Sequence, residues 1–183
     1  PLFQAEDGIR DDLEGLVGSE MCIRDRSIRI NMMGAALDDF VNGLQNQILE
    51  ETRAEFGDVA FERWQNPLYA GAINNSDGHG RITGSCGDTM QIFLKFKKNK
   101  VKEATFLTDG CGSSTVCGSF AAELALGKTP DELAEITGDT ILKILGKFPE
   151  ENRHCAFLAA DTLQAALNSY MIKRTRKARQ DLL

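Results

Sequence analysis

Residues 89–114 read TMQIFLKFKKNKVKEATFLTDGCGSS and contain the change of periodicity that decides the fold. Every second residue from Met90 to Phe96 is apolar, which predicts a strand with one buried face. The KNK triplet at 98–100 predicts a turn, and residues 101–108 predict a second strand that completes a hairpin. From Gly112 onward the pattern becomes helical, so this stretch marks the passage from sheet to helix.

The segments on either side extend this pattern. Residues 81–85 predict a further strand before the hairpin, and residues 35–56 predict an amphipathic helix with apolar positions at helical spacing. After the hairpin, the predicted helices run over 113–126, from the Thr129 N-cap, over 139–145, and over 154–177. Strands in one run followed by helices in another predict an α+β fold.

The first 31 residues are predicted not to belong to the natural protein. Residues 4–11 and 15–26 back-translate to strings that resemble a sequencing-library adapter and a transposase end. We therefore expect residues 1–31 to be an artefactual leader, disordered or arbitrary in shape, followed by a single domain over 32–183 that begins naturally at Met32 or Met33. The leader is acidic and lacks an apolar stretch, which excludes a secretory signal peptide.

Removing that leader changes the charge of the chain. The full sequence has a formal net charge of −6, whereas the part after residue 26 has −2, because residues 1–26 carry seven acidic and three basic side chains. A nearly neutral domain gives no electrostatic reason to bind nucleic acid or an anionic membrane. With no apolar run long enough to span a bilayer, we expect a cytoplasmic protein.

Four cysteines remain after the leader, and three of them lie where predicted elements meet. Cys86 lies in a glycine-flanked turn, Cys111 between a strand and a helix, and Cys155 at the start of the last helix. A metal-binding cysteine must be a thiolate, which a helix N-terminus favours. We therefore expect a lowered thiol pKa at Cys111 and Cys155. Spacing alone leaves a metal site and small buried cysteines equally supported, because no C-x-x-C pair is present.

A resemblance favours the metal site. The motifs GSCGD at 84–88, DGCGSS at 109–114 and GKTPDE at 127–132, followed by the His154-Cys155 pair, resemble the IscU/NifU N-terminal family of iron–sulfur cluster assembly scaffolds in order and spacing. The similarity runs from about Leu37 to Tyr170. It implies a small three-stranded antiparallel sheet covered by helices, with a long C-terminal helix.

The resemblance also implies a function and a set of ligands. The family assembles a [2Fe–2S] or [4Fe–4S] cluster, of which we expect [2Fe–2S], from iron and from sulfur supplied by a cysteine desulfurase, and passes it to recipient apo-proteins. Cys86, Cys111 and Cys155 match its cluster ligands. Asp88 matches the carboxylate that makes the cluster labile, and His154 matches an alternative ligand. Zinc is a further candidate metal in the isolated protein.

The sequence departs from the family at two places. The segment that a dedicated Hsp70-type chaperone reads in IscU proteins is FPEEN here, at 148–152, and its two glutamates disfavour that chaperone as a partner. Cys117 is an extra thiol on the helix after Cys111. It is interpreted first as a small core residue and second as an accessory thiol for persulfide or metal. His79 is interpreted as a solvated loop residue.

Two other functions compete with the scaffold. A SufU-like zinc-binding sulfur acceptor would activate a desulfurase, but the insertion typical of that type between the second and third cysteines is missing. An enzyme with a Cys155 nucleophile would need His154 as its base, and neighbouring residues on a helix project about 100° apart. We therefore expect a scaffold or carrier rather than an enzyme.

Overall fold

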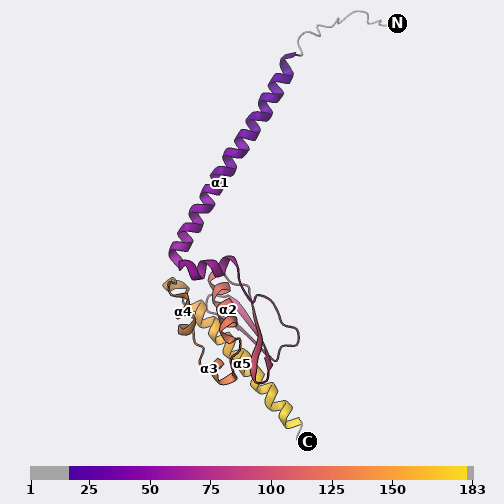
Figure 1. Ribbon diagram of the computed structural model, residues 1–183, viewed down its shortest axis with the longest axis vertical. Helices are drawn as coiled ribbons and strands as arrows, with labels where there is room; N and C mark the ends of the chain where they lie inside the picture. Colours follow the sequence, from indigo (N-terminus) through magenta and orange to yellow (C-terminus); the bar gives the residue numbers. More distant parts are fainter. Residues whose placement is uncertain (1–16, 181–183) are drawn as a thin grey trace, which may run out of the picture. The chain divides into compact units, whose positions relative to one another are not determined.

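The computed structural model describes residues 17–180, with side chains from Leu37 onward (Figure 1). The chain divides into two compact units, Pro1–Leu49 and Glu50–Leu183, each described by itself. None of the helices within residues 17–180 is long and apolar enough to cross a membrane.

The first unit contains the greater part of helix α1, Val17–Gln65. The predicted helix over 35–56 lies inside α1, whose first turns include residues 17–31 of the expected leader. Residues 17–31 belong to helix α1, and residues 19–33 contain no Gly or Pro to interrupt a helix. Residues 1–16 lie outside the described part, and the origin of the leader stays a prediction. The predicted apolar face of this unit is exposed and consists of Leu37, Phe40, Val41, Leu44 and Ile48.

The second unit begins with the end of α1, which does not stop at the predicted residue 56. Gly57 interrupts the helix with φ 79° and ψ 163°, and helical structure then resumes as far as Gln65. Arg63 anchors this last part to the domain, because its guanidinium pairs with Glu123 at 2.5 Å and lies 4.0 Å from the Phe120 ring centroid. The end of α1 is therefore held against helix α2, Gly112–Ala125.

The sheet confirms the predicted hairpin and its third strand. Strands β1 (Gly78–Thr83), β2 (Thr89–Lys97) and β3 (Lys100–Thr108) are antiparallel in the order β1-β2-β3. β1 begins earlier than the predicted residue 81, so His79 lies in a strand rather than in a loop. Its ring stacks on Phe93, directly opposite in β2, with 4.6 Å between centroids. That stacking extends the strand into a polar stretch that propensity alone assigns to a loop.

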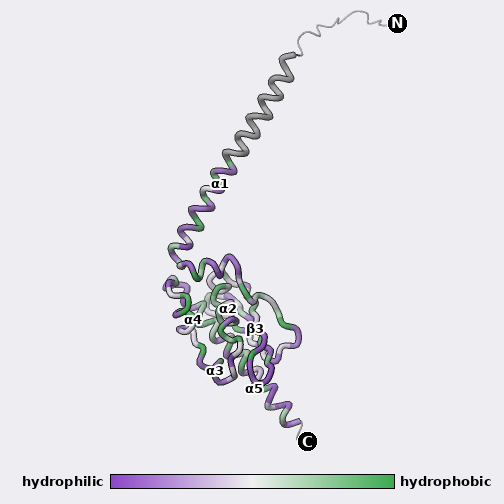
Figure 2. Tube along the Cα trace, in the orientation of Figure 1, coloured by the Kyte–Doolittle hydropathy of each residue, from purple (hydrophilic) through white to green (hydrophobic). Residues whose placement is uncertain are grey.

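Two helices cover one face of the sheet, α5 (His154–Gln180) over β1 and α2 (Gly112–Ala125) over β3. The core between them consists of alternate residues of β2, which are fully buried, and of the inner faces of both helices; α2 is strongly apolar (Figure 2). This arrangement confirms the α+β fold and the long C-terminal helix.

Two short helices and one turn connect α2 to α5. These are α3 (Pro130–Ala134), α4 (Gly138–Leu145) and the 3-10 turn η1 (Glu150–Asn152). Thr129 caps α3 as predicted, since its hydroxyl accepts from Glu132 N while the Glu132 carboxylate accepts from Thr129 N at 2.8 Å. These helices fill the stretch between Cys111 and Cys155 without an inserted loop, so Cys155 returns to the same end of the sheet as Cys111.

Candidate metal centre

Three of the predicted ligands meet at the end of the sheet where β1 and β2 are joined. The ligand atoms of Asp88, Cys111 and Cys155 all lie within 4.8 Å of one another. Asp88 comes from the β1–β2 loop, Cys111 is the N-cap of α2, and Cys155 is the second residue of α5. The Cys111 side chain is exposed, whereas Cys155 is buried. Two sulfur ligands and one carboxylate form a donor set suited to iron or zinc.

The motif around Cys111 holds two of these segments together. The Asp109 carboxylate accepts a hydrogen bond from Thr89 N at 2.6 Å, and Asp109 N donates to Thr89 O at 3.2 Å. These bonds fix the end of β3 to the start of β2. These hydrogen bonds between β2 and the end of β3 therefore place the Asp88 loop next to the N-terminus of α2.

Cys86 lies outside this group of ligand atoms. It occupies a turn in which Gly87 N donates to Gly84 O at 3.1 Å, and Gly84 N donates to Asp88 O at 2.9 Å. Its thiol is exposed. The structure thus brings together three of the four predicted ligands and leaves Cys86 on the same loop as Asp88, two residues away.

Ser114 lies at the centre of the site, although sequence reasoning assigned it no role beyond its place in the motif. It is fully buried in the first turn of α2, and its hydroxyl donates to Asp88 Oδ2 at 2.6 Å. The same oxygen atom of Ser114 lies 3.5 Å from Cys155 Sγ and 3.9 Å from Cys111 Sγ. The only sequence signal was its spacing, since a residue three positions after Cys111 shares its helix face.

The hydrogen bond from Ser114 lowers the pKa of Asp88 below its usual value, and the backbone N–H of Cys111 acts in the same direction. Burial opposes this effect without reversing it. Both donors act on Oδ2, with Cys111 N at 3.3 Å, so the Asp88 carboxylate is held in its ionised form beside two sulfur atoms.

The prediction that the helix N-terminus lowers the pKa of Cys155 is wrong. Burial raises the pKa of this thiol to about 11, even though Ser114 acts in the opposite direction. Desolvation outweighs the helix terminus because the Cys155 side chain points into the core and not into solvent. The apo-protein therefore carries Cys155 as a neutral thiol at neutral pH.

The His154 ring is closer to Cys155 than its helix position predicts. Its Nδ1 lies 2.7 Å from Glu151 O, and its Nε2 lies 3.5 Å from Cys155 Sγ. The expectation that neighbouring residues would diverge was wrong here because His154 is the first residue of α5, where the side chain can fold back onto η1. His154 is placed beside the site without entering its group of ligand atoms.

Cys117 lies in the core on α2, fully buried. Burial raises the pKa of its thiol well above the usual value, and the neighbouring Cys155 and Cys111 act in the same direction. The position agrees with the interpretation as a small core residue, since the side chain has no route to solvent.

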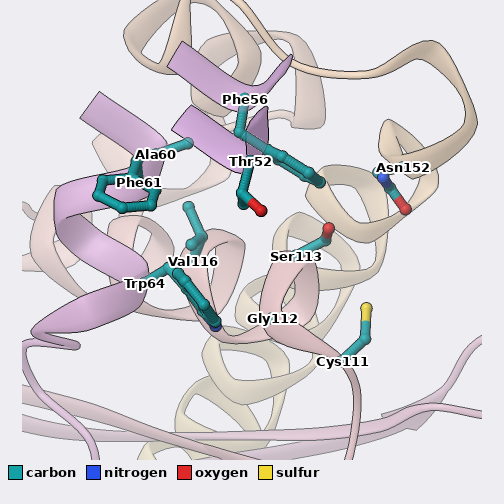
Figure 3. Close-up of a pocket in the computed structure, with 10 residues that line it drawn as sticks. All are labelled: Thr52, Phe56, Ala60, Phe61, Trp64, Cys111, Gly112, Ser113, Val116 and Asn152. Atoms are coloured by element: carbon teal, nitrogen blue, oxygen red, sulfur yellow. The ribbon is translucent and has the colours of Figure 1, made fainter. Parts of the chain in front are cut away.

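An apolar pocket of about 340 Å³ adjoins Cys111 (Figure 3). It lies between the end of α1, which contributes Phe56 and Trp64, and the start of α2, which contributes Val116. Trp64 also covers Gly112, where an added Cβ would meet the indole nitrogen at 2.8 Å. Sequence reasoning missed Trp64, because the helix containing it was expected to end at residue 56.

Comparison with known proteins identifies relatives over most of the second unit. Residues 55–177 match the NifU-like N terminal domain family. The iron-sulfur cluster assembly scaffold protein IscU 1 of Archaeoglobus fulgidus is 39% identical over 119 residues, which are 64% of this chain and 78% of that protein. The iron-sulfur cluster assembly enzyme IscU of Drosophila melanogaster is 36% identical over 121 residues, 63% of this chain and 78% of that protein.

Solved structures show the same fold. The crystal structure of a nitrogen-fixing NifU-like protein (N-terminal) from Brucella abortus aligns with a TM-score of 0.56 at 18% identity, over 67% of this chain and 98% of that chain. A putative scaffold protein for the SUF system from Fervidobacterium islandicum aligns with a TM-score of 0.53 at 20% identity, over 63% of this chain and 98% of that chain.

Proposed function

Because the chain belongs to the NifU-like N-terminal domain family, we propose that it is a scaffold on which an iron–sulfur cluster is assembled and from which the cluster is passed on. The observation that carries the proposal is the convergence of Asp88, Cys111 and Cys155 within 4.8 Å at one end of the sheet. The cluster is cargo in this function, and the protein acts as a carrier rather than as an enzyme.

Cys86 supplies the third thiolate in this proposal. It is exposed on the polar turn two residues before Asp88, and in this proposal a movement of that loop brings its sulfur to the other ligands. Cys155 is buried and fixed by α5, whereas Cys86 and Cys111 are exposed. Iron and sulfur therefore enter and leave from the side of Cys86 and Cys111.

The donor set suits a cargo that must be released. Thiolates are soft ligands that bind iron–sulfur clusters firmly, whereas a carboxylate is a harder and weaker ligand for them. Replacing the fourth thiolate by Asp88 leaves one weak bond at which a recipient can begin to take the cluster. A [2Fe–2S] cluster is the smaller cargo and fits a site with four ligands on two loops and one helix end.

The partners follow from this function. A cysteine desulfurase supplies the sulfur, and recipient apo-proteins take the finished cluster. The dedicated Hsp70-type chaperone is not expected, because Glu150 and Glu151 lie where its peptide groove would bind. Zinc can occupy the site in the isolated protein, and His154 can then complete the ligand set from 3.5 Å beside Cys155.

The test is anaerobic reconstitution with iron, cysteine and a desulfurase, followed by visible absorption. Wild-type protein should develop sulfide-to-iron charge-transfer bands, and Cys111→Ala should not. Cys117→Ala is the matched control, since that thiol lies in the core, and it should retain the bands. A colourless protein that holds one zinc ion and only stimulates the desulfurase would favour the SufU-like sulfur acceptor instead.

The labilising role of Asp88 has its own test. Asp88→Ala should hold the reconstituted cluster longer than the wild type during transfer to an apo-ferredoxin, because the weak ligand is gone. An equally short-lived cluster in Asp88→Ala would show that lability arises elsewhere.

A further inference from the structure

Ser114 touches three of the four proposed ligands, and no other described side chain outside the ligand set does so. Its hydroxyl donates to Asp88 at 2.6 Å and lies within 3.9 Å of both sulfur atoms, of Cys155 and of Cys111. It is completely buried, in the first turn of a fourteen-residue helix. A buried hydroxyl at this point must find a partner, since an unsatisfied one would destabilise the fold.

A serine hydroxyl carries a single hydrogen, which decides among these three contacts. The carboxylate at 2.6 Å is charged and close, so the hydrogen points to Asp88 Oδ2 and the sulfur atoms see the oxygen lone pairs. Cys111 N donates to the same carboxylate oxygen at 3.3 Å. Two donors thus hold Oδ2, and Oδ1 is the carboxylate oxygen that neither of them engages.

Gly110 leaves the space that the hydrogen bond between Ser114 and Asp88 occupies. Gly110 lies so close that an added Cβ would collide with the Asp88 carboxylate and with Ser114 Oγ. The chain thus leaves room for a carboxylate clamped between a helix hydroxyl and a helix N–H. Without the hydroxyl, Asp88 would keep one long bond and could rotate out of the site on its loop.

We propose that Ser114 is the positioning residue of the site: it clamps one oxygen of Asp88 so that the other is presented to the metal beside Cys111 and Cys155. This inference rests on the proposed scaffold function. Residues that orient a ligand in this way commonly change metal affinity by about 10-fold to 100-fold when removed. Ser114 acts through Asp88, so its contribution should exist only while Asp88 is present.

The test is a double-mutant cycle read by anaerobic titration with Co²⁺ under reducing conditions. Ser114→Ala should weaken Co²⁺ binding about tenfold in the wild-type background and less than about twofold in the Asp88→Ala background. The Co²⁺ ligand-field bands of Ser114→Ala should shift toward those of Asp88→Ala, while the thiolate charge-transfer intensity stays unchanged. An equal loss in both backgrounds would overturn the inference.

Two further variants separate positioning from packing. Ser113→Ala is the matched control, because Ser113 is also buried but has no hydrogen bond to the ligands among the described residues, and its affinity should stay at the wild-type level. Ser114→Thr keeps the hydroxyl and should bind Co²⁺ within about threefold of wild type, which holds even if Ser114→Ala folds poorly. A tenfold loss in Ser114→Thr would contradict the clamp.

The result can be told apart from failure of the scaffold proposal. A wild type that binds Co²⁺ and shows the coupling, but builds no cluster, would refute the scaffold and leave the clamp intact. A wild type that builds the cluster, with additive effects of Ser114 and Asp88, would refute the clamp alone.

Discussion

In β1, Gly80 lies against the backbone of α5, whereas before α2 Gly110 lies against the side chains of Asp88 and Ser114. Both positions lack a Cβ because a neighbour approaches too closely to admit one. At Gly80 the neighbours are Thr162 O and Ala166 N, atoms of a rigid helix. At Gly110 the neighbours are groups that can turn aside.

Because the neighbours of Gly80 are backbone atoms and those of Gly110 are side chains, we expect Gly80 to affect stability and Gly110 to affect metal binding. Crowding at Gly80 would push β1 away from α5 and open the core, because backbone atoms cannot yield locally. Crowding at Gly110 would turn the Asp88 carboxylate without disturbing the sheet. Changes at the first contact should therefore be measured in unfolding, and changes at the second in metal binding.

The largest expected effect is the loss of stability in Gly80→Ala. The added methyl group would overlap Thr162 O and Ala166 N, so the strand or the helix must shift, at a cost of about 3 kcal/mol. Urea unfolding followed by far-UV circular dichroism measures this change. Gly43→Ala is the control, because a methyl group added there in α1 meets no atom within 4 Å, and it should not destabilise the domain. Equal stabilities of Gly80→Ala and wild type would show that β1 and α5 can move apart freely.

Gly110→Ala should give the opposite result, with a stability loss of no more than about 1 kcal/mol and a Co²⁺ affinity lower by about tenfold. The atoms nearest to the methyl group belong to the Asp88 carboxylate and the Ser114 hydroxyl, side-chain groups that we expect to rotate at little cost to packing. Urea unfolding and Co²⁺ titration of the same sample check both parts. A large loss of stability with unchanged affinity would place Gly110 in the same class as Gly80.

Sequence reasoning identified the strands and helices more completely than the contacts between them. The alternation from Met90 to Phe96 identified the hairpin because burial on one face of a strand imposes period two. The cap at Thr129 was found because Thr129 acts on its neighbours in sequence. Contacts between α5 and β1 were not found, since a glycine in a strand does not reveal which backbone it faces.

The site was predicted as a list of ligands and not as a network. Motif order identified the cysteines, but the contact of Ser114 with Asp88 and the contact of Trp64 with Gly112 depend on how separate segments fold together. The pKa of Cys155 was predicted in the wrong direction because position at a helix start is visible in sequence and burial is not. Desolvation depends on the packed core, which only the structure describes.

Cys117→Ala tests whether Cys117 contributes to packing of the core or to binding of the metal. Cys117 is fully buried on α2, after Cys111 in the sequence, so removing its sulfur should cost about 1 kcal/mol of stability. Co²⁺ affinity should stay within about twofold of wild type, since Cys117 is not among the grouped ligand atoms. A tenfold loss of affinity with unchanged stability would instead make it an accessory thiol.

One expected effect appears only at alkaline pH: the pH dependence that the buried thiols impart to stability. The pKa of Cys155 rises from 9.0 to about 11 on folding, so the folded state binds the proton more tightly. The stabilisation is complete below pH 9 and is lost as pH rises toward 11, because only the unfolded chain is then free to ionise. Burial of Cys117 acts in the same direction.

Urea unfolding of reduced apo-protein across this interval, compared between wild type and Cys155→Ala, isolates the contribution of Cys155. Contributions from all other groups are common to both proteins and cancel in the difference. Stability of Cys155→Ala should fall less steeply between pH 9 and 11, with a residual slope from Cys117. If the unfolding free energies of wild type and Cys155→Ala depend on pH in the same way, the Cys155 thiol is as well solvated in the folded protein as in the unfolded chain. Cys155 would then be a surface residue and not a buried one.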